Sequence, residues 1–359
     1  MLRALELARK GKTTPNPMVG TVLVKNNLII AEGFHSRAGG PHAEVVALRK
    51  AGNKARGADL YVNLEPCCHV GRTPPCTDAI IQSGVSRVFA GMKDPNKLVQ
   101  GKGIRVLKAA GIKVSVGMMK NDCEKLNEVF VKVMKTGVPF VTVKTAMSLD
   151  GKIATREGDS QWISGIKSRD FVHELRNQND AILVGTNTIL KDNPRLTCRL
   201  KKNGGRNPAR IILDRRNRIP LTAKVFANSK TQRVIYVSSS KLSTKREKLL
   251  TAKNIEVLKV KMLKSGFDLK QLMKLLVQKD LNSILIEGGG EINSSALEAG
   301  IVDRVLAFIS PILVGGQQAP SLIGGKGVAK IAKAMRLKNM KVIQIGDDLM
   351  VEAEPCSAE

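Results

Sequence analysis

PCCHVGRTPPC, residues 66–76, places three cysteines and a histidine within eleven positions, and PHAE stands upstream at 41–44. His42, Cys67 and Cys76 offer imidazole and thiol donors, which zinc prefers over the oxygen donors of harder cations. The cluster is open to three interpretations: a structural zinc knot, a redox pair, or a catalytic metal centre. The number of protein ligands and the neighbouring acidic residue distinguish them.

Glu44 favours the catalytic interpretation. A structural zinc site needs a fourth protein ligand, for which Cys68 and His69 are candidates, whereas catalytic zinc keeps three ligands and a water. Glu44 follows His42 by two residues at a predicted helix start, so its carboxyl group lies beside the metal without being a necessary ligand. We expect His42, Cys67 and Cys76 to hold one Zn²⁺ and Glu44 to be the catalytic acid and base.

The order of these residues is typical of zinc deaminases, in which H-x-E precedes Pro-Cys and a second cysteine at a helix start. Zinc lowers the pKa of bound water from about 15.7 toward about 7, and Glu44 would carry the proton to the ring nitrogen and the leaving amine. Eight residues separate Cys67 from Cys76 here, where zinc deaminases commonly keep two. We expect this longer loop to wall the substrate pocket.

Composition limits the other classes of function. A chain of 359 residues predicts two domains. No apolar run reaches 18 residues, no secretory signal opens the chain, and the cysteine pattern favours metal over disulfides, so we expect a cytoplasmic protein without a membrane partner. The net charge of +28 suggests nucleic acid, but two Tyr, one Trp and eight Phe are few for base stacking. We expect no nucleic-acid partner.

The pattern of apolar segments predicts two α/β domains, 1–138 and 139–359, because strands alternate with helices in both. Around KNN a hairpin is expected at 18–33, and HAEVVALRKAG predicts a helix with Val45, Val46 and Leu48 inward. NDCEKLNEVFVKVMK predicts one charged helix before the boundary. The lysine-rich stretch 239–265 is interpreted as solvated surface.

Several motifs together resemble the bifunctional riboflavin-biosynthesis deaminase/reductases over nearly the whole chain. TTPNPMVG, HAE, LEPCCHVGRTPPC and AGMKDPN resemble the deaminase half. KTAMSLDGKIA, DSQWISG, LRNQNDAILVGTNTILKDNPRLTCR and IEGGGEINSSAL resemble the reductase half. The resemblance implies a cytidine-deaminase-like three-layer domain followed by a dihydrofolate-reductase-like domain that uses NADPH.

For the first half, the resemblance implies hydrolytic deamination of a diaminohydroxy-phosphoribosylamino-pyrimidine, a phosphorylated pyrimidine ribotide. It places Asn16, His69 and Arg72 at the substrate, although Arg72 could also be an ordinary surface arginine. The chain departs from the family at Cys68, where Ser is common, and at Lys97, where Pro is common. Cys68 could compete for zinc or oxidise, but neither departure removes a proposed catalytic group.

The second half is less explicit from its residues, because no G-x-G-x-x-G follows a strand. SILIEGGGEINSSALEAG predicts a strand, a glycine turn and a helix start, which favour a phosphate or merely a tight turn. The resemblance implies hydride transfer from NADPH to the ribosyl C1 carbon. It implies NADPH contacts from Ala146, Trp162, Thr188, Asp192, Gly289, Gly290, Glu291, Ile292, Asn293, Ser294 and Ser295.

The same resemblance implies substrate contacts from Ser160, Arg176, Leu196, Arg199 and Glu287. Arg176 and Arg199 are expected to clamp phosphate, because guanidinium groups match phosphate oxygens, and we expect Lys144 to orient the sugar. Trp162 could instead fill a core, and Asp192 could open a turn.

Two rival functions remain at this stage. One is a deaminase of nucleic acid or nucleosides with an accessory second half, which predicts salt-sensitive nucleic-acid binding. The other is a zinc-stabilised scaffold, which predicts four protein ligands. Decay of one activity would affect the second half more plausibly, and the oligomeric state is open, with a homo-oligomer as one alternative.

Overall fold

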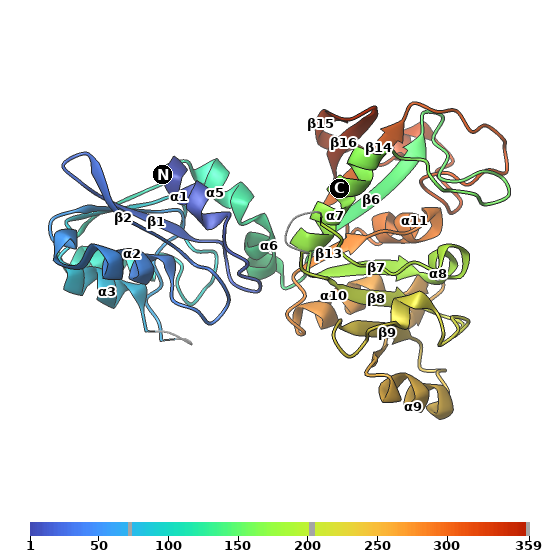
Figure 1. Cartoon of the computed structure of the whole chain (residues 1–359), viewed down its shortest axis with the longest axis horizontal. Helices are drawn as coiled ribbons and strands as arrows, with labels where there is room; N and C mark the ends of the chain where they lie inside the picture. Colours follow the sequence, from blue (N-terminus) through green and yellow to red (C-terminus); the bar gives the residue numbers. More distant parts are fainter. Residues whose placement is uncertain (71–73, 201–204, 357–359) are drawn as a thin grey trace. The chain divides into compact units, whose positions relative to one another are not determined.

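The computed structural model describes residues 1–70, 74–200 and 205–356. The chain divides into two compact units, Met1–Val138 and Pro139–Glu359 (Figure 1). Each unit contains its own sheet. Within the described residues, no helix is long and apolar enough to cross a membrane.

The first unit is built on a five-stranded sheet in the order β2-β1-β3-β4-β5. β1 is antiparallel to β2 and β3, while β3, β4 and β5 are parallel. The turn between β1 and β2 has positive φ at Asn26 and Asn27, the conformation of a type I′ turn, which confirms the predicted hairpin. The strands are β1 (Gly20–Lys25), β2 (Leu28–Phe34), β3 (Asp59–Val62), β4 (Arg87–Ala90) and β5 (Lys113–Val116).

Helices cover both faces of this sheet, with α1 and α5 on one side and α2 and α3 on the other (Figure 1). Leu23 and Leu60 are fully buried in the core of this unit. The helices are α1 (Leu2–Ala8), α2 (Ala43–Ala51), α3 (Cys76–Ser83), α4 (Lys102–Ala109), α5 (Lys120–Leu126) and α6 (Glu128–Thr136), with a short 3-10 turn at Gly52–Ala55.

The inward face of α2 differs from the prediction. The helix buries Ala43, Ala47 and Leu48, and leaves Val45 and Val46 only half-buried. The helix approaches β2 through its backbone: a Cβ added at Gly33 of β2 would lie 2.3 Å from the carbonyl oxygen of Ala43 and 2.6 Å from the nitrogen of Ala47. The Val46 Cβ lies 3.0 Å from the same position, so Val46 contacts this strand although it is only half-buried.

The charged helix predicted before the boundary is two helices, α5 and α6, which are separated at Asn127. The Asn127 side chain accepts a hydrogen bond from the Met18 N–H (2.8 Å) and donates one to the Met18 carbonyl (3.0 Å). This contact, 109 residues distant in sequence, holds the loop before β1 against the break between the two helices.

The second unit contains a nine-stranded sheet in the order β10-β9-β8-β7-β13-β6-β14-β16-β15. In Figure 1 this order runs from β9 at the lower side to β15 at the upper side. The seven strands from β10 to β14 are parallel, and β16 and β15 are antiparallel additions. They are β6 (Phe140–Ser148), β7 (Ala181–Gly185), β8 (Ala209–Leu213), β9 (Val234–Ser238), β10 (Glu256–Lys259), β13 (Ser283–Ile286), β14 (Arg304–Ser310), β15 (Leu337–Ile345) and β16 (Asp348–Pro355).

The helices of this unit connect the parallel strands, as the alternation of segments predicted. They are α7 (Ile166–Gln178), α8 (Thr186–Asp192), α9 (Thr244–Ala252), α10 (Leu269–Val277) and α11 (Gly290–Glu298), with 3-10 turns at Lys224–Phe226 and Ile331–Lys333. The stretch 239–265, interpreted as solvated surface, holds α9, β10 and the strand β11 (Met262–Leu263) that pairs with β12 (Gly266–Phe267), and its lysines are exposed.

Candidate active sites

Three elements of the first unit bring the predicted metal ligands together. His42 is the residue before α2, Cys76 is the first residue of α3, and Cys67 lies in the loop that follows β3. The His42 Nδ1 atom is 3.1 Å from Cys76 Sγ and 3.4 Å from Cys67 Sγ. The Cys76 N–H also points at Cys67 Sγ, at 3.3 Å.

This donor set fits zinc. One donor atom from each of His42, Cys67 and Cys76 lies within 4.8 Å of the others, and no Cys68 or His69 atom joins this cluster among the described residues. Hydrogen bonding from Cys76 lowers the pKa of Cys67, which favours the thiolate form that binds metal. One imidazole and two sulfur donors, with no fourth protein ligand in the described cluster, match an open site rather than a closed knot.

Glu44 lies in the first turn of α2 and is buried, with 3% of its surface exposed. Its Oε2 atom has no hydrogen-bond partner among the described residues. Burial raises the pKa of Glu44 to about 7. A buried carboxyl oxygen without a partner, beside a group of metal ligands, is suited to holding and passing a proton.

The other residues expected at this site are Asn16, His69 and Arg72, and the structure describes the first two. The Asn16 side chain contacts His35 Nε2 at 3.2 Å, and His35 Nδ1 contacts the Pro41 carbonyl at 3.0 Å. The His69 Nδ1 atom is buried without a hydrogen-bond partner among the described residues. Arg72 lies outside the described residues.

The sequence analysis did not single out His35. Its ring lies 5.4 Å from that of His42, edge to face, so it links Asn16 to the metal cluster. Its spacing of seven residues before His42 was the available signal, but a lone histidine in a strand-to-loop segment is not specific.

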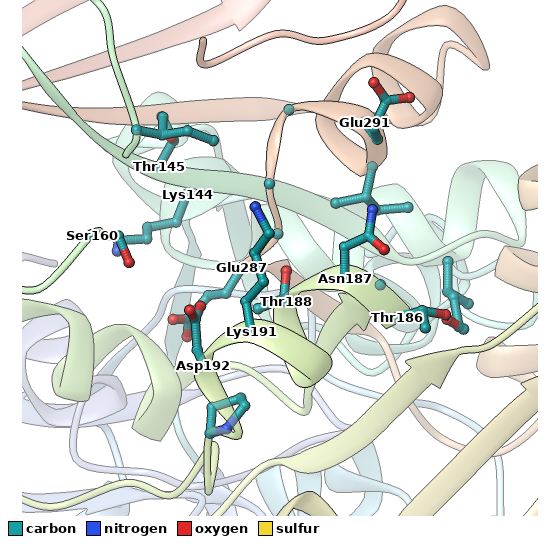
Figure 2. A pocket seen from close by; sticks show the side chains of 18 of the residues that line it. Lys144, Thr145, Ser160, Thr186, Asn187, Thr188, Lys191, Asp192, Glu287 and Glu291 are labelled. Atoms are coloured by element: carbon teal, nitrogen blue, oxygen red, sulfur yellow. The ribbon is translucent and has the colours of Figure 1, made fainter. Parts of the chain in front are cut away.

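The second unit contains a cavity of about 1630 Å³ at the carboxyl ends of β6, β7, β8 and β13, where ligands bind in open α/β sheets. Figure 2 shows side chains of β6 and α8 in this pocket, together with Glu287, which follows β13, and Glu291 of α11. Most of the expected contacts line this cavity: Lys144, Ala146, Ser160, Trp162, Arg176, Thr188, Asp192, Leu196, Arg199, Glu287, Gly289, Gly290, Glu291, Ile292 and Ser295.

Two expected cofactor contacts do not line the cavity. Asn293 is fully buried and donates a hydrogen bond to the Leu322 carbonyl (3.1 Å). Ser294 is buried and donates to Glu298 (2.7 Å). Asn293 thus ties α11 to the segment at Leu322, and Ser294 bonds within the helix.

The three glycines at the start of α11, Gly288, Gly289 and Gly290, serve different purposes. A Cβ at Gly288 would lie 1.9 Å from the Ile292 side chain, and one at Gly290 would lie 2.7 Å from the Ser321 carbonyl. Gly289 meets nothing within 4 Å. The first and third glycines therefore permit close packing, and Gly289 leaves the cavity-facing start of α11 open.

Arg176, which is expected to clamp phosphate, lines the cavity and is paired with Glu287. Its guanidinium forms two hydrogen bonds of 2.7 Å with Glu287 and a third with the Thr197 carbonyl (3.1 Å). Lys144 lies near this pair, and burial lowers its pKa. Thus Arg176 holds Glu287 in place, and Lys144 is the cation that faces Glu287.

Further cavity residues were missed. His173 accepts a hydrogen bond from the Arg199 N–H (3.3 Å), and Arg169 lies over the Trp162 ring at 4.7 Å. Trp162 is 68% exposed, so it does not fill a core. The signal for a further basic group was the run DRRNR after β8, which places Arg215, Arg216 and Arg218 on the cavity.

Family models match both units. The cytidine and deoxycytidylate deaminase zinc-binding region matches residues 1–92, and the RibD C-terminal domain matches residues 139–351. Riboflavin biosynthesis protein RibD of Actinobacillus pleuropneumoniae is 43% identical over 354 residues, which cover 98% of this chain and 93% of that protein.

The chain belongs to the RibD family. RibD of Aquifex aeolicus is 44% identical over 353 residues, covering 98% of this chain and 96% of that protein. The structure of Acinetobacter baumannii RibD has a TM-score of 0.90 at 39% identity, with 99% and 98% of the two chains covered. That of a diaminohydroxyphosphoribosylaminopyrimidine deaminase/5-amino-6-(5-phosphoribosylamino)uracil reductase from Thermotoga maritima has a TM-score of 0.87 at 39% identity, with 99% and 97% covered.

These relationships confirm the resemblance and the predicted fold class, a cytidine-deaminase-like first unit and a reductase-type α/β second unit. Like other RibD proteins, the chain is a bifunctional deaminase and reductase of riboflavin biosynthesis.

Proposed function

We propose that the first unit deaminates a phosphorylated diamino-pyrimidine ribotide at a zinc site formed by His42, Cys67 and Cys76. The second unit would then reduce the ribosyl chain of the product with NADPH. The observation that supports this most directly is the close approach of His42, Cys67 and Cys76 beside Glu44, whose Oε2 has no described partner. The proposal needs no nucleic acid or membrane, and we place both steps in the cytoplasm.

The deamination follows from the groups around the cluster. Zinc bound to the three ligands supplies Lewis-acid activation of water. Glu44 would accept one water proton at Oε2 and pass it to the ring nitrogen. It would then carry the second proton, from the added hydroxyl group, to the amine, which leaves as ammonia. Asn16 and His69 contact the pyrimidine, and we include Arg72 as a ligand of the substrate phosphate.

The reduction is assigned to the cavity of the second unit. NADPH supplies the hydride, and the chain holds the nicotinamide and the sugar face to face. Thr188, Asp192 and the start of α11 from Gly289 would hold the cofactor. Lys144 and Glu287 would orient the ribosyl group, since their charges meet at one wall of the cavity.

The basic run after β8 supports NADPH over NADH. Arg215, Arg216 and Arg218 are exposed on the cavity lining, at the carboxyl end of a parallel strand. Arginine at such a position accommodates the 2′-phosphate that distinguishes NADPH. Arg199, also on this lining, remains the proposed contact for the substrate phosphate.

A two-stage assay tests the proposal. Purified chain loaded with zinc is incubated with the diamino-pyrimidine ribotide, with and without NADPH. We expect ammonia in both reactions and the ribityl product only with NADPH. Ammonia release that survives replacement of Glu44 by Gln, or ribityl product without NADPH, would contradict the assigned steps.

A further inference from the structure

A buried carboxyl group outside the metal cluster, that of Glu65, connects the metal loop to α4. Glu65 is 2% exposed. Its Oε2 accepts hydrogen bonds from the backbone N–H groups of Asp94 (3.1 Å) and Gly101 (2.9 Å). Its Oε1 accepts one from the N–H of Ile104 (3.2 Å). Gly101 and Ile104 lie at the start of α4, and Asp94 lies in the loop that joins β4 to α4.

Helix α4 needs this carboxyl group because its own sequence provides no cap. Its N-cap residue is Gly101, with φ of 80°, and its first turn contains no acidic residue. The first N–H groups of a helix have no partner within it, and a side-chain oxygen normally accepts from the second or third. Ile104 is the third residue of α4, so Glu65 supplies the cap from another part of the chain.

The residue after Glu65 packs on the same turn. A Cβ added at Gly103 would lie 2.1 Å from the Pro66 carbonyl oxygen, so Pro66 is in direct contact with the first turn of α4. On the other side, the Cys67 carbonyl accepts a hydrogen bond from the Thr77 N–H in α3 (3.1 Å). The backbone is therefore held on both sides of the Cys67 side chain.

We propose that Glu65 is a positioning residue for the metal centre. By fastening residues 65–66 to the start of α4, it fixes the place from which Cys67 Sγ meets His42 and Cys76. It contributes no donor atom to the described cluster and acts through the backbone. The inference rests on the proposed zinc site and deepens it.

The test is Glu65→Gln, which keeps the size of the side chain but presents an NH₂ group to backbone donors. We expect about tenfold weaker zinc binding, the lower end of what supporting groups contribute, measured by competition with a chromogenic chelator. Deaminase kcat should fall at limiting zinc and recover with excess zinc. The KM for the ribotide and the reductase rate should stay unchanged.

Glu32→Gln is the matched control, because Glu32 is in the same unit and bonds Arg3 at the surface. It should leave zinc affinity unchanged. Wild-type zinc affinity in Glu65→Gln overturns the inference, whatever happens to thermal stability. If wild type binds zinc no better than Cys76→Ser, the proposed zinc site fails instead, and the inference falls with it.

Gly103→Ala provides a second variant in case Glu65→Gln does not fold. It keeps the carboxyl group and displaces the Pro66 carbonyl from the first turn of α4. Weaker zinc binding with an unchanged reductase rate supports the inference. Zinc affinity equal to that of wild type overturns it.

Discussion

Arg176 and Glu287 both line the cavity of the second unit and form a bidentate ion pair, in which both N–O distances are 2.7 Å. Arg176 belongs to α7 and Glu287 follows β13, so the pair joins a helix to the centre of the nine-stranded sheet. Both side chains are largely buried. A single arginine thus fixes the carboxyl group that faces Lys144.

Replacing Arg176 with Met should destabilise the second unit by about 3–5 kcal/mol, because Glu287 would be left buried without its partner. The Arg176→Met/Glu287→Met double variant should recover most of that loss. Urea unfolding of the three proteins measures both effects. Equal losses of unfolding free energy in the single and double variants would show that the unpaired Glu287 carboxylate is not the cause of the destabilisation.

The same pair makes stability depend on pH. Burial alone would raise the pKa of Glu287, but the charge and hydrogen bonds of Arg176 outweigh it, and the pKa lies below the usual value of about 4.3. Such a carboxyl group stabilises the fold above its usual pKa and loses that effect as the pH falls further. As the pH falls below that usual value, the thermal unfolding temperature of wild type should decrease more steeply than that of the double Met variant. The same dependence of unfolding temperature on pH in both proteins would contradict this role of the ion pair.

Glu44→Gln should lower the rate of ammonia release by about 10²–10⁴-fold, the usual contribution of a general acid and base. Zinc content and reduction of the deaminated substrate should be unchanged, since the ligands and the second unit are intact. Ammonia production, metal analysis and NADPH oxidation report the three properties separately. Simultaneous loss of zinc would mean that Glu44 also holds the metal.

Cys68 and Cys76 should respond oppositely to replacement by Ser. Cys76→Ser removes a donor of the described cluster and should abolish zinc binding and deamination. Cys68→Ser should retain both, because Cys68 is outside that cluster. Zinc stoichiometry after dialysis distinguishes them. Zinc loss in Cys68→Ser would restore the four-ligand interpretation.

Removing the charges of Arg215 and Arg216 should weaken discrimination between the two nicotinamide cofactors. Each Arg→Gln change should raise the KM for NADPH about tenfold or more, consistent with losing a hydrogen bond to a charged group, and should barely affect the KM for NADH. Lys338→Gln, on β15 outside the cavity lining, is the control. Equal effects on both cofactors would place the two arginines elsewhere than at the 2′-phosphate.

The turns, the strands and the metal ligands could be predicted, because each depends on a short stretch of sequence. Asn26 and Asn27 favour the left-handed conformation of a tight turn, and alternating apolar runs predict the strands. The metal ligands were predictable because the H-x-E motif followed by two cysteines is a combination that few kinds of site other than zinc deaminases require. Their spacing also indicates that loops and helix starts would bring them together.

Contacts between distant segments could not be predicted in this way. Glu287 meets Arg176 over 111 residues, and Glu65 meets Ile104 over 39. Neither pair follows a helix or strand period. The inward face of α2 was also mispredicted, because hydrophobicity favoured Val45 and Val46, whereas the helix backbone at Ala43 and Ala47 packs on Gly33 of β2.

The position of the boundary between the two units has a consequence for how such enzymes arise and diverge. Every strand of the five-stranded sheet precedes Val138, and every strand of the nine-stranded sheet follows Pro139. A chain break at Val138–Pro139 would therefore cut neither sheet, and each set of proposed catalytic residues would stay on one fragment. Gene fission or fusion at this point separates or joins the two reactions while preserving the hydrogen-bonded strand order of both sheets.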